Sequence, residues 1–237
     1  MANADKLDAA PIAFAPPRER KVAPYQRLKQ AILEGGLEPG QQLVESALAE
    51  WCQVSRTPIR KALTMLEAEG LVEIEPNKGA AVRSFSVEDV SEIYDLRAVL
   101  EGHAARRAAS RISREELDRL WDLVGDMERK DRGQSLSHEE EIRWLVGANG
   151  EFHGTIAVAA RNARLEQLIR RTVQVPLVFK AFYWYTPHEH IISNHYHRQI
   201  SGALEAGDAE RAEIVMREHV YEGRDFVMRA LKEETDA

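Results

Sequence analysis

Histidine and asparagine side chains in the second half of the chain have types and spacing that suit a metal site. All eight histidines lie at or beyond His103. His153 follows Asn149 by four residues, so both side chains point the same way from one helix, while His197 and His219 belong to later segments. Donors that converge from separate helices form the metal sites of helical bundles, and imidazole suits zinc, nickel, copper or iron. The spacing leaves a second interpretation open, because a single histidine on a helix commonly packs in the core or faces solvent.

A second group of residues, in the first third of the chain, has the chemistry of DNA recognition. The segment Val-Ser-Arg-Thr-Pro-Ile-Arg-Lys places Arg56 and Arg60 four residues apart, on one face of a helix. Arginine can donate two parallel hydrogen bonds to guanine O6 and N7. Ser55, Thr57 and the free N–H groups of a helix start suit phosphate. The alternative is that Arg56, Arg60 and Lys61 only solvate an exposed helix face.

The elements around this segment predict a winged helix-turn-helix. Apolar residues at helical spacing predict helices over residues 23–35, 45–51 and 55–69, with Ser55 as N-cap and Pro58 in the first turn. Alternating apolar residues on both sides of a Pro-Asn-Lys-Gly turn predict a β-hairpin over residues 71–82. Lys78 and Gly79 at the hairpin tip would let this wing approach the DNA backbone or minor groove.

Helical periodicity continues after Ser84, with no further strand signal. We expect helices over residues 87–109, 113–131, 138–160, 162–185, 188–206 and 208–233, which form a bundle. The predicted fold is therefore mainly α, with a winged helix that carries a small β-hairpin, followed by an all-α bundle. The predicted domains are a disordered tail over residues 1–21, a DNA-binding domain over 22–84 and an effector- and metal-binding domain over 85–237.

Composition and charge agree with a two-part protein that acts inside the cell. From Arg18 to Arg83 the chain carries ten Lys and Arg against nine Asp and Glu, whereas the whole chain has a net charge of -7. A near-neutral first part attached to an acidic remainder fits a DNA-binding module joined to one that does not bind DNA. The single cysteine, Cys52, suits a reducing cytoplasm, and no apolar run is long enough to span a membrane.

The first part resembles the winged-helix domain of the GntR family of regulators. The resemblance rests on LAEWCQVSRTPIRKALTMLEAEGLVEIEPNKGAAV and covers about residues 22–84. It implies DNA contact by Arg56, Thr57, Arg60 and the wing residues Lys78 and Gly79. Some family members have an arginine where this chain has Ser46, so that base contact is absent here or replaced.

The second part is similar to the FCD domain, which accompanies the winged helix in the FadR subfamily of GntR regulators. The matching segments are YDLRAVLE, EFH, RNARL, HRQI, GDA and MREH. In metal-binding members an Asp and three His bind a divalent ion, and this pattern implies that Asn149, His153, His197 and His219 bind zinc, nickel, manganese or iron. Asn149 replaces the usual Asp, and an amide oxygen is a poorer ligand for a dication than a carboxylate.

Arg97 is the candidate to bind a small effector that carries a carboxylate, because guanidinium pairs with carboxylates through two hydrogen bonds. An ion pair within the bundle, with a residue such as Glu101, is the alternative. We therefore expect a homodimeric repressor in the cytoplasm that binds a pseudo-palindromic DNA operator and releases it when a small organic acid binds near a metal. The alternatives are a metal-dependent enzyme that uses the same histidines, and a helical scaffold whose winged helix binds protein. The enzyme is disfavoured because the chain lacks HExxH, GxSxG and phosphate-loop motifs.

Overall fold

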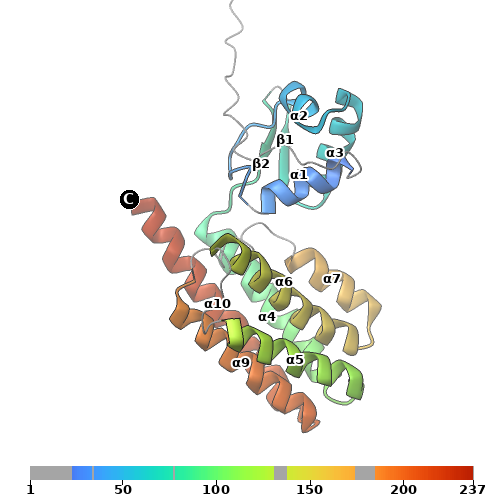
Figure 1. The fold of residues 1–237 in the computed structure, drawn as a ribbon, viewed down its shortest axis with the longest axis vertical. Coiled ribbons are helices and arrows are strands. Elements are labelled where there is room, and N and C mark those ends of the chain that lie inside the picture. Colours follow the sequence, from blue (N-terminus) through green and yellow to red (C-terminus); the bar gives the residue numbers. More distant parts are fainter. Residues whose placement is uncertain (1–22, 34, 77, 131–137, 174–184, 237) are drawn as a thin grey trace, which may run out of the picture. The chain divides into compact units, whose positions relative to one another are not determined.

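The computed structural model describes residues 23–33, 35–76, 78–130, 138–173 and 185–236 (Figure 1). The chain forms two compact units, Met1–Phe85 and Ser86–Ala237. Helices dominate both units, and the described strands form one hairpin, which confirms the predicted mainly α fold with a small wing. The predicted tail over residues 1–21 lies outside the described residues.

The first unit contains three helices followed by a hairpin, as the sequence predicts. The helices are α1 (Pro24–Leu33), α2 (Glu45–Cys52) and α3 (Arg56–Ala68), and the strands are β1 (Val72–Glu75) and β2 (Gly79–Val82). The strands are antiparallel, with Val72 opposite Val82, and Gln42 forms an isolated bridge to Ala81 at the outer edge of β2. The fully buried Leu28, Ile59, Leu66 and Leu71 place the core between the helices and the base of the hairpin.

Ser55 is the N-cap residue of α3, as predicted, but it lacks the expected side-chain bond. Ser55 has the extended backbone of an N-cap residue, but its side chain makes no capping hydrogen bond. The usual donors to such a side chain are the backbone N–H groups of the second and third helical residues. The third residue here is Pro58, which has no N–H, so the predicted cap loses one of its donors.

The second unit is a bundle of helices (Figure 1). Its described helices are α4 (Val87–Ala108), α5 (Arg114–Lys130), α6 (His138–Ala159), α7 (Ala163–Val173), α9 (Pro187–Glu205) and α10 (Ala209–Asp236). Five of the six predicted helices agree to within a few residues. The sixth, predicted over 162–185, is described as a helix to Val173, and residues 174–184 lie outside the described part. Within the described residues, no helix has both the length and the apolar character to cross a membrane.

Helix α4 lies at the centre of this bundle, in contact with α6, α7, α9 and most extensively α10. It begins with a capping box in which the side chains of Ser86 and Asp89 each bond the other's backbone N–H. Gly102 lies at the contact with α10. A Cβ atom at this position would lie 2.6 Å from Cγ of Arg217 and 3.4 Å from the carbonyl oxygen of Glu213. The missing side chain therefore permits the close approach of α4 and α10.

This packing predicts opposite effects for two glycine-to-alanine changes inside helices. Gly102→Ala should lower the free energy of unfolding, because overpacking costs about 1–3 kcal/mol and outweighs a helix-propensity gain of about 1 kcal/mol. Gly147→Ala in α6 should raise it by about 0.5–1 kcal/mol, because an added Cβ meets no atom within 4 Å. Urea unfolding followed by tryptophan fluorescence in a Trp51→Phe background would report on the second unit alone, since the other tryptophans lie there. Stabilisation by both changes would contradict the close contact.

Candidate functional site

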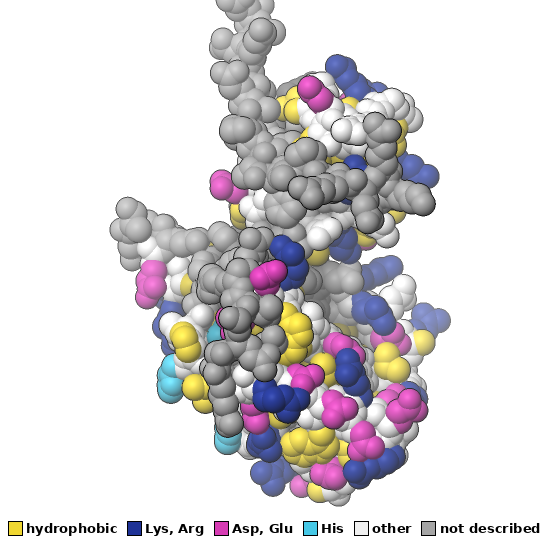
Figure 2. All heavy atoms as spheres, viewed as in Figure 1, with side chains coloured by type: hydrophobic (Ala, Val, Ile, Leu, Met, Phe, Trp, Pro, Cys, Tyr) yellow, Lys and Arg dark blue, Asp and Glu magenta, His cyan; other side chains and the backbone are white. Residues whose placement is uncertain are grey.

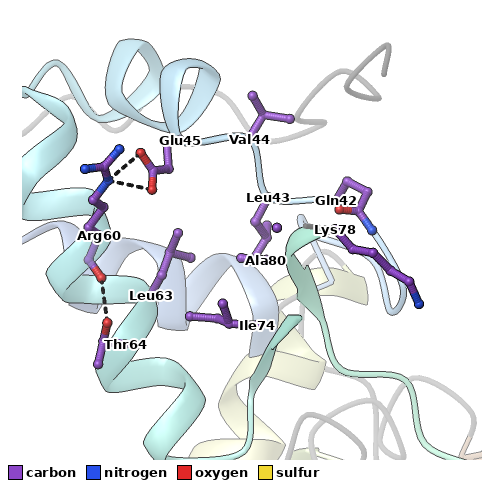
Figure 3. Close-up of a pocket in the computed structure, with 11 residues that line it drawn as sticks. Gln42, Leu43, Val44, Glu45, Arg60, Leu63, Thr64, Ile74, Lys78 and Ala80 are labelled. Atoms are coloured by element: carbon purple, nitrogen blue, oxygen red, sulfur yellow. Dashed lines mark hydrogen bonds and ion pairs between the residues drawn. The ribbon is translucent and has the colours of Figure 1, made fainter. Parts of the chain in front are cut away.

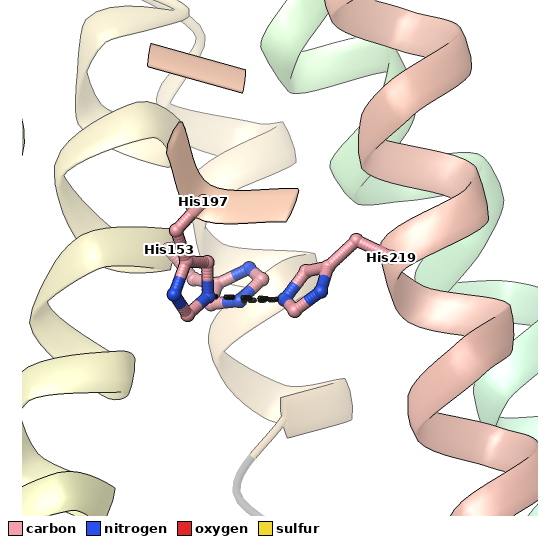
Figure 4. A group of neighbouring side chains, drawn as sticks. All are labelled: His153, His197 and His219. Carbon is pink, nitrogen blue, oxygen red and sulfur yellow. Dashed lines mark hydrogen bonds between the residues drawn. The ribbon is translucent and has the colours of Figure 1, made fainter. Parts of the chain in front are cut away.

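Three histidines from three helices meet inside the second unit (Figure 4). His153 comes from α6, His197 from α9 and His219 from α10, and each side chain is less than a tenth exposed. Nε2 of His219 lies 3.2 Å from Nε2 of His153 and 3.1 Å from Nε2 of His197. One potential ligand atom from each residue lies within 4.8 Å of the others. The structure thus brings together three of the four predicted metal ligands.

Neighbouring rings and helix starts hold these imidazoles in place. The Phe152 ring lies 4.4 Å from the His197 ring, centre to centre, and the His153 and His219 rings are stacked at 5.1 Å. Helix α9 begins at a capping box of Thr186 and Glu189 with Pro187 in its first turn, and α10 begins after Asp208, which accepts a bond from the backbone N–H of Arg211. These signals fix where each helix begins and therefore which residues face the interior.

Burial favours neutral imidazoles at His197 and His219. Burial, followed by the charge of His153, holds the pKa of His197 well below its usual range. Burial, followed by the charges of His197 and His153, does the same for the pKa of His219. A neutral imidazole keeps a lone pair on one nitrogen, which is the form that binds a metal.

Mutual hydrogen bonds cannot satisfy the three Nε2 atoms. Glu101 Oε2 lies 2.5 Å from Nδ1 of His153, which favours a proton on Nδ1 and leaves a lone pair on Nε2. Nε2 of His219 faces the Nε2 atoms of both other histidines. It carries one proton at most, so it can donate a good hydrogen bond to only one of them. A cation facing three lone pairs would resolve this conflict. The residues present therefore fit a divalent metal of the kind that imidazole binds.

Glu101 links the histidine cluster to Arg97. Nε of Arg97 donates to Oε1 of Glu101 at 2.8 Å, and the other carboxylate oxygen is the one beside His153. This carboxylate oxygen and Nδ1 of His153 lie close together without the geometry of a hydrogen bond. The Arg97 guanidinium also lies over the Tyr94 ring, 4.8 Å from its centre. Of the two roles considered for Arg97, the structure contains the ion pair with Glu101.

Burial makes this pairing necessary. Arg97 is 5% exposed and Glu101 is 3% exposed. Burial acts to raise the pKa of the Glu101 carboxyl, but Arg97 and His153 outweigh it and hold that pKa well below its usual range. Glu101 is therefore a carboxylate that adds a negative charge next to the imidazoles. Its contact with His153 was not predicted, and no sequence spacing signals a contact between residues on different helices.

Asn149, the fourth predicted ligand, lies one helical turn before His153 on α6 and is half-buried. Side chains four residues apart project from the same side of a helix. The amide is thus on the His153 side of α6, where the resemblance to metal-binding domains implies a carboxylate.

The predicted DNA-contact residues lie on the surface of the first unit. All of them are exposed: Ser55, Arg56, Thr57, Arg60, Lys61, Lys78 and Gly79. A pocket of about 460 Å³ lies between α3, the wing and the segment before α2, and it is lined by residues that include Arg60, Thr64, Lys78 and Gly79 (Figure 3). The structure therefore places part of the predicted reading helix and the wing tip around one concave surface.

Two of these cations have carboxylate partners that sequence reasoning missed. Nε of Arg60 lies 2.8 Å from both carboxylate oxygens of Glu45 at the start of α2 (Figure 3). Lys78 Nζ lies 2.7 Å from Glu75 across the hairpin turn. The Glu75–Lys78 spacing of three residues could have signalled the second pair, whereas nothing in the sequence signals the first.

Acidic and basic side chains are interleaved over the face of the second unit seen in Figure 2. Ion pairs in this unit join Arg161, between α6 and α7, to Glu116 on α5, and Arg198 on α9 to Glu128 on α5. The residues after Ser84 carry a net charge of -7, but the described acidic side chains seen on this face form no single patch.

Comparisons with known proteins match both units. The description "Bacterial regulatory proteins, gntR family" matches residues 21–82, and the FCD domain matches residues 92–222. The regulator LutR of Bacillus subtilis is 27% identical, over 83% of this chain and 95% of its own. The regulator YdhC of the same species is 30% identical over 145 residues, which are 61% of this chain and 62% of YdhC.

A solved structure shows the same fold. Escherichia coli McbR/YncC has a TM-score of 0.73 at 22% identity, over 91% of this chain and all of the other. The relatives named above are transcriptional regulators. This agrees with the predicted regulator and not with the alternative of a metal-dependent enzyme.

The buried pair of Arg97 and Glu101 predicts non-additive effects on stability. Glu101→Leu should lower the free energy of unfolding of the second unit by about 3–5 kcal/mol, because it leaves a buried guanidinium unpaired. The double change Arg97→Met with Glu101→Leu should recover most of this loss, since it removes both charges. Urea unfolding in the Trp51→Phe background measures the free energy of unfolding of the parent, of the two single variants and of the double variant, which together form a double-mutant cycle. A double variant as unstable as the sum of the single changes would contradict the pairing.

Proposed function

Because the chain belongs to the GntR family of bacterial regulators and carries an FCD domain, we propose that it is a repressor controlled by a small organic acid. The observation that supports this proposal is the buried cluster of His153, His197 and His219 in the helical unit of a DNA-binding regulator. A cluster of this kind is costly to bury without a ligand to satisfy it. Its place in the helical unit, outside the winged helix, suits a sensor.

We propose that the three histidines, with Asn149 beside them, hold a divalent metal such as zinc, nickel, manganese or iron. When bound, the metal would supply a positive centre that attracts an anionic ligand. The imidazoles supply neutral lone pairs, and Glu101 supplies a negative charge from behind His153. This carboxylate offsets part of the charge that is lost where Asn149 replaces an acid.

Arg97 is the proposed partner of the acid's carboxylate. Nε of Arg97 bonds Glu101, which fixes the position of the guanidinium, and its terminal nitrogens are the donors proposed for the acid. Glu101 contacts both Arg97 and His153. An acid that binds Arg97 would therefore also change the surroundings of a proposed metal ligand, His153. This shared contact is the proposed route by which acid binding and metal binding affect each other.

DNA binding follows from the family, and its residues are part of the proposal. A homodimer would place one α3 in each half-site of a pseudo-palindromic operator. Arg56 and Arg60 would contact bases, Ser55, Thr57 and Lys61 would contact phosphates, and Lys78 and Gly79 would follow the backbone or minor groove. Acid binding would shift the population of dimers away from the form that fits the operator.

Metal binding should respond to the residue at position 149. Asn149→Asp should tighten zinc binding by about tenfold or more, because a carboxylate is a better ligand than an amide, and Glu101→Gln should weaken it about 10–100-fold. Competition with a fluorescent chelator measures both changes. Asn162→Asp is the matched control, since it adds the same charge where the side chain caps α7. Equal affinity in Asn149→Asp and the control would contradict a role for position 149.

The sensing function predicts that operator affinity depends on an acid. An operator can be selected from random DNA with the purified protein and its affinity measured by anisotropy with a panel of carboxylic acids, with and without chelator. At least one acid should weaken binding about 5–150-fold, and His197→Ala should lose that response while retaining DNA binding. Arg56→Ala with Arg60→Ala is the control that removes operator binding. The same affinity with every acid and with chelator would contradict the sensing half of the proposal.

A further inference from the structure

The pair of Glu45 and Arg60 lies where a carboxylate is unfavourable for DNA binding. Arg60 projects from α3 with 69% of its side chain exposed, while Glu45 is 33% exposed and lies deeper (Figure 3). A negative charge on a DNA-facing surface repels phosphate and weakens non-specific binding. An exposed ion pair contributes only about 0–1 kcal/mol to stability. Neither DNA affinity nor fold stability therefore accounts for this carboxylate.

The geometry of the pair gives it a different role. Both carboxylate oxygens lie 2.8 Å from Nε of Arg60. Within the part of the chain that the structure describes, the terminal Nη1 and Nη2 atoms have no hydrogen-bond partner. These two atoms form the end of the guanidinium that can donate two parallel bonds to O6 and N7 of guanine. Glu45 therefore restrains Nε of the guanidinium and leaves Nη1 and Nη2 available for DNA.

The backbone of Arg60 also has a side-chain partner. Its backbone carbonyl accepts a hydrogen bond from Oγ1 of Thr64, one turn later on α3. Glu45 is the first residue of α2, so the restraint on Arg60 comes from the other helix of the helix-turn-helix. Arg56, four residues earlier, has no ion pair among the described residues. The two predicted reading arginines thus differ, because one is oriented by a carboxylate and the other is not.

We propose that Glu45 is a positioning residue that orients Arg60 for end-on recognition of a guanine. The proposal rests on the proposed role of Arg60 in operator binding. An arginine held before it meets DNA loses less side-chain freedom on binding. Glu45 thereby increases the preference for the operator over other DNA, while it lowers the affinity for DNA in general.

The test compares affinities of the full-length protein for the selected operator and for an unrelated duplex of equal length. Glu45→Gln should lower the ratio of the two affinities about tenfold, while affinity for the unrelated duplex stays equal or increases. Retained binding to unrelated DNA also shows that the variant is folded. Glu75→Gln is the matched control, because it removes a carboxylate from Lys78 on the same surface. It should change both affinities equally and leave the ratio unchanged.

A second pair of variants tests whether Glu45 acts through Arg60. Arg60→Lys keeps the charge but loses the two-bond fork, so it should also lower the ratio about tenfold. Glu45→Gln combined with Arg60→Lys should lower the ratio no further than Arg60→Lys alone. Additive losses, or a Glu45→Gln variant that behaves like Glu75→Gln, would overturn the positioning role. Unchanged operator binding in Arg60→Ala would instead refute the role of Arg60 itself.

Discussion

The carboxylate of Glu101 is the constraint around which the interior of the second unit is arranged. A buried charge is tolerated only with partners, and Glu101 has two, Arg97 on its own helix and His153 on α6. This requirement joins α4 to the histidine cluster. The close contact of α4 with α10 at Gly102 then brings His219 to the same place. One buried carboxylate thus connects the packing of the bundle with the chemistry of its interior.

The two proposed sites use the same device in different surroundings. In the second unit, a buried glutamate fixes Arg97 and leaves other guanidinium N–H groups for a carboxylate. In the first unit, an exposed glutamate fixes Nε of Arg60 and leaves the outer nitrogens for DNA. The buried pair contributes to stability because water cannot solvate either charge if its partner is removed. The exposed pair contributes little to stability because solvent screens it, so its proposed effect is on DNA selectivity.

Sequence patterns predicted the elements well because the patterns are local. The wing and five helices of the second unit follow from residue spacing. The convergence of His153, His197 and His219 depended on resemblance to a family, since spacing cannot say which helices are neighbours. The Glu101–His153 and Glu45–Arg60 contacts escaped prediction for the same reason: their partners are 52 and 15 residues apart and meet only after packing. The Ser55 cap was predicted from residue type, without regard to the proline three residues later.

That proline has a consequence for how α3 behaves before and after it meets DNA. A helix start without its cap loses about 0.5–2 kcal/mol relative to a capped one, so the first turn of α3 should open more readily than its middle. A DNA phosphate that accepts hydrogen bonds from the free N–H groups would cap that turn in place of a side chain. Ordering of the first turn then becomes part of DNA binding, and the amides of Arg56 and Thr57 should exchange with solvent more slowly on DNA. The missing side-chain cap thus leaves backbone N–H groups at the start of α3 for a phosphate to bind.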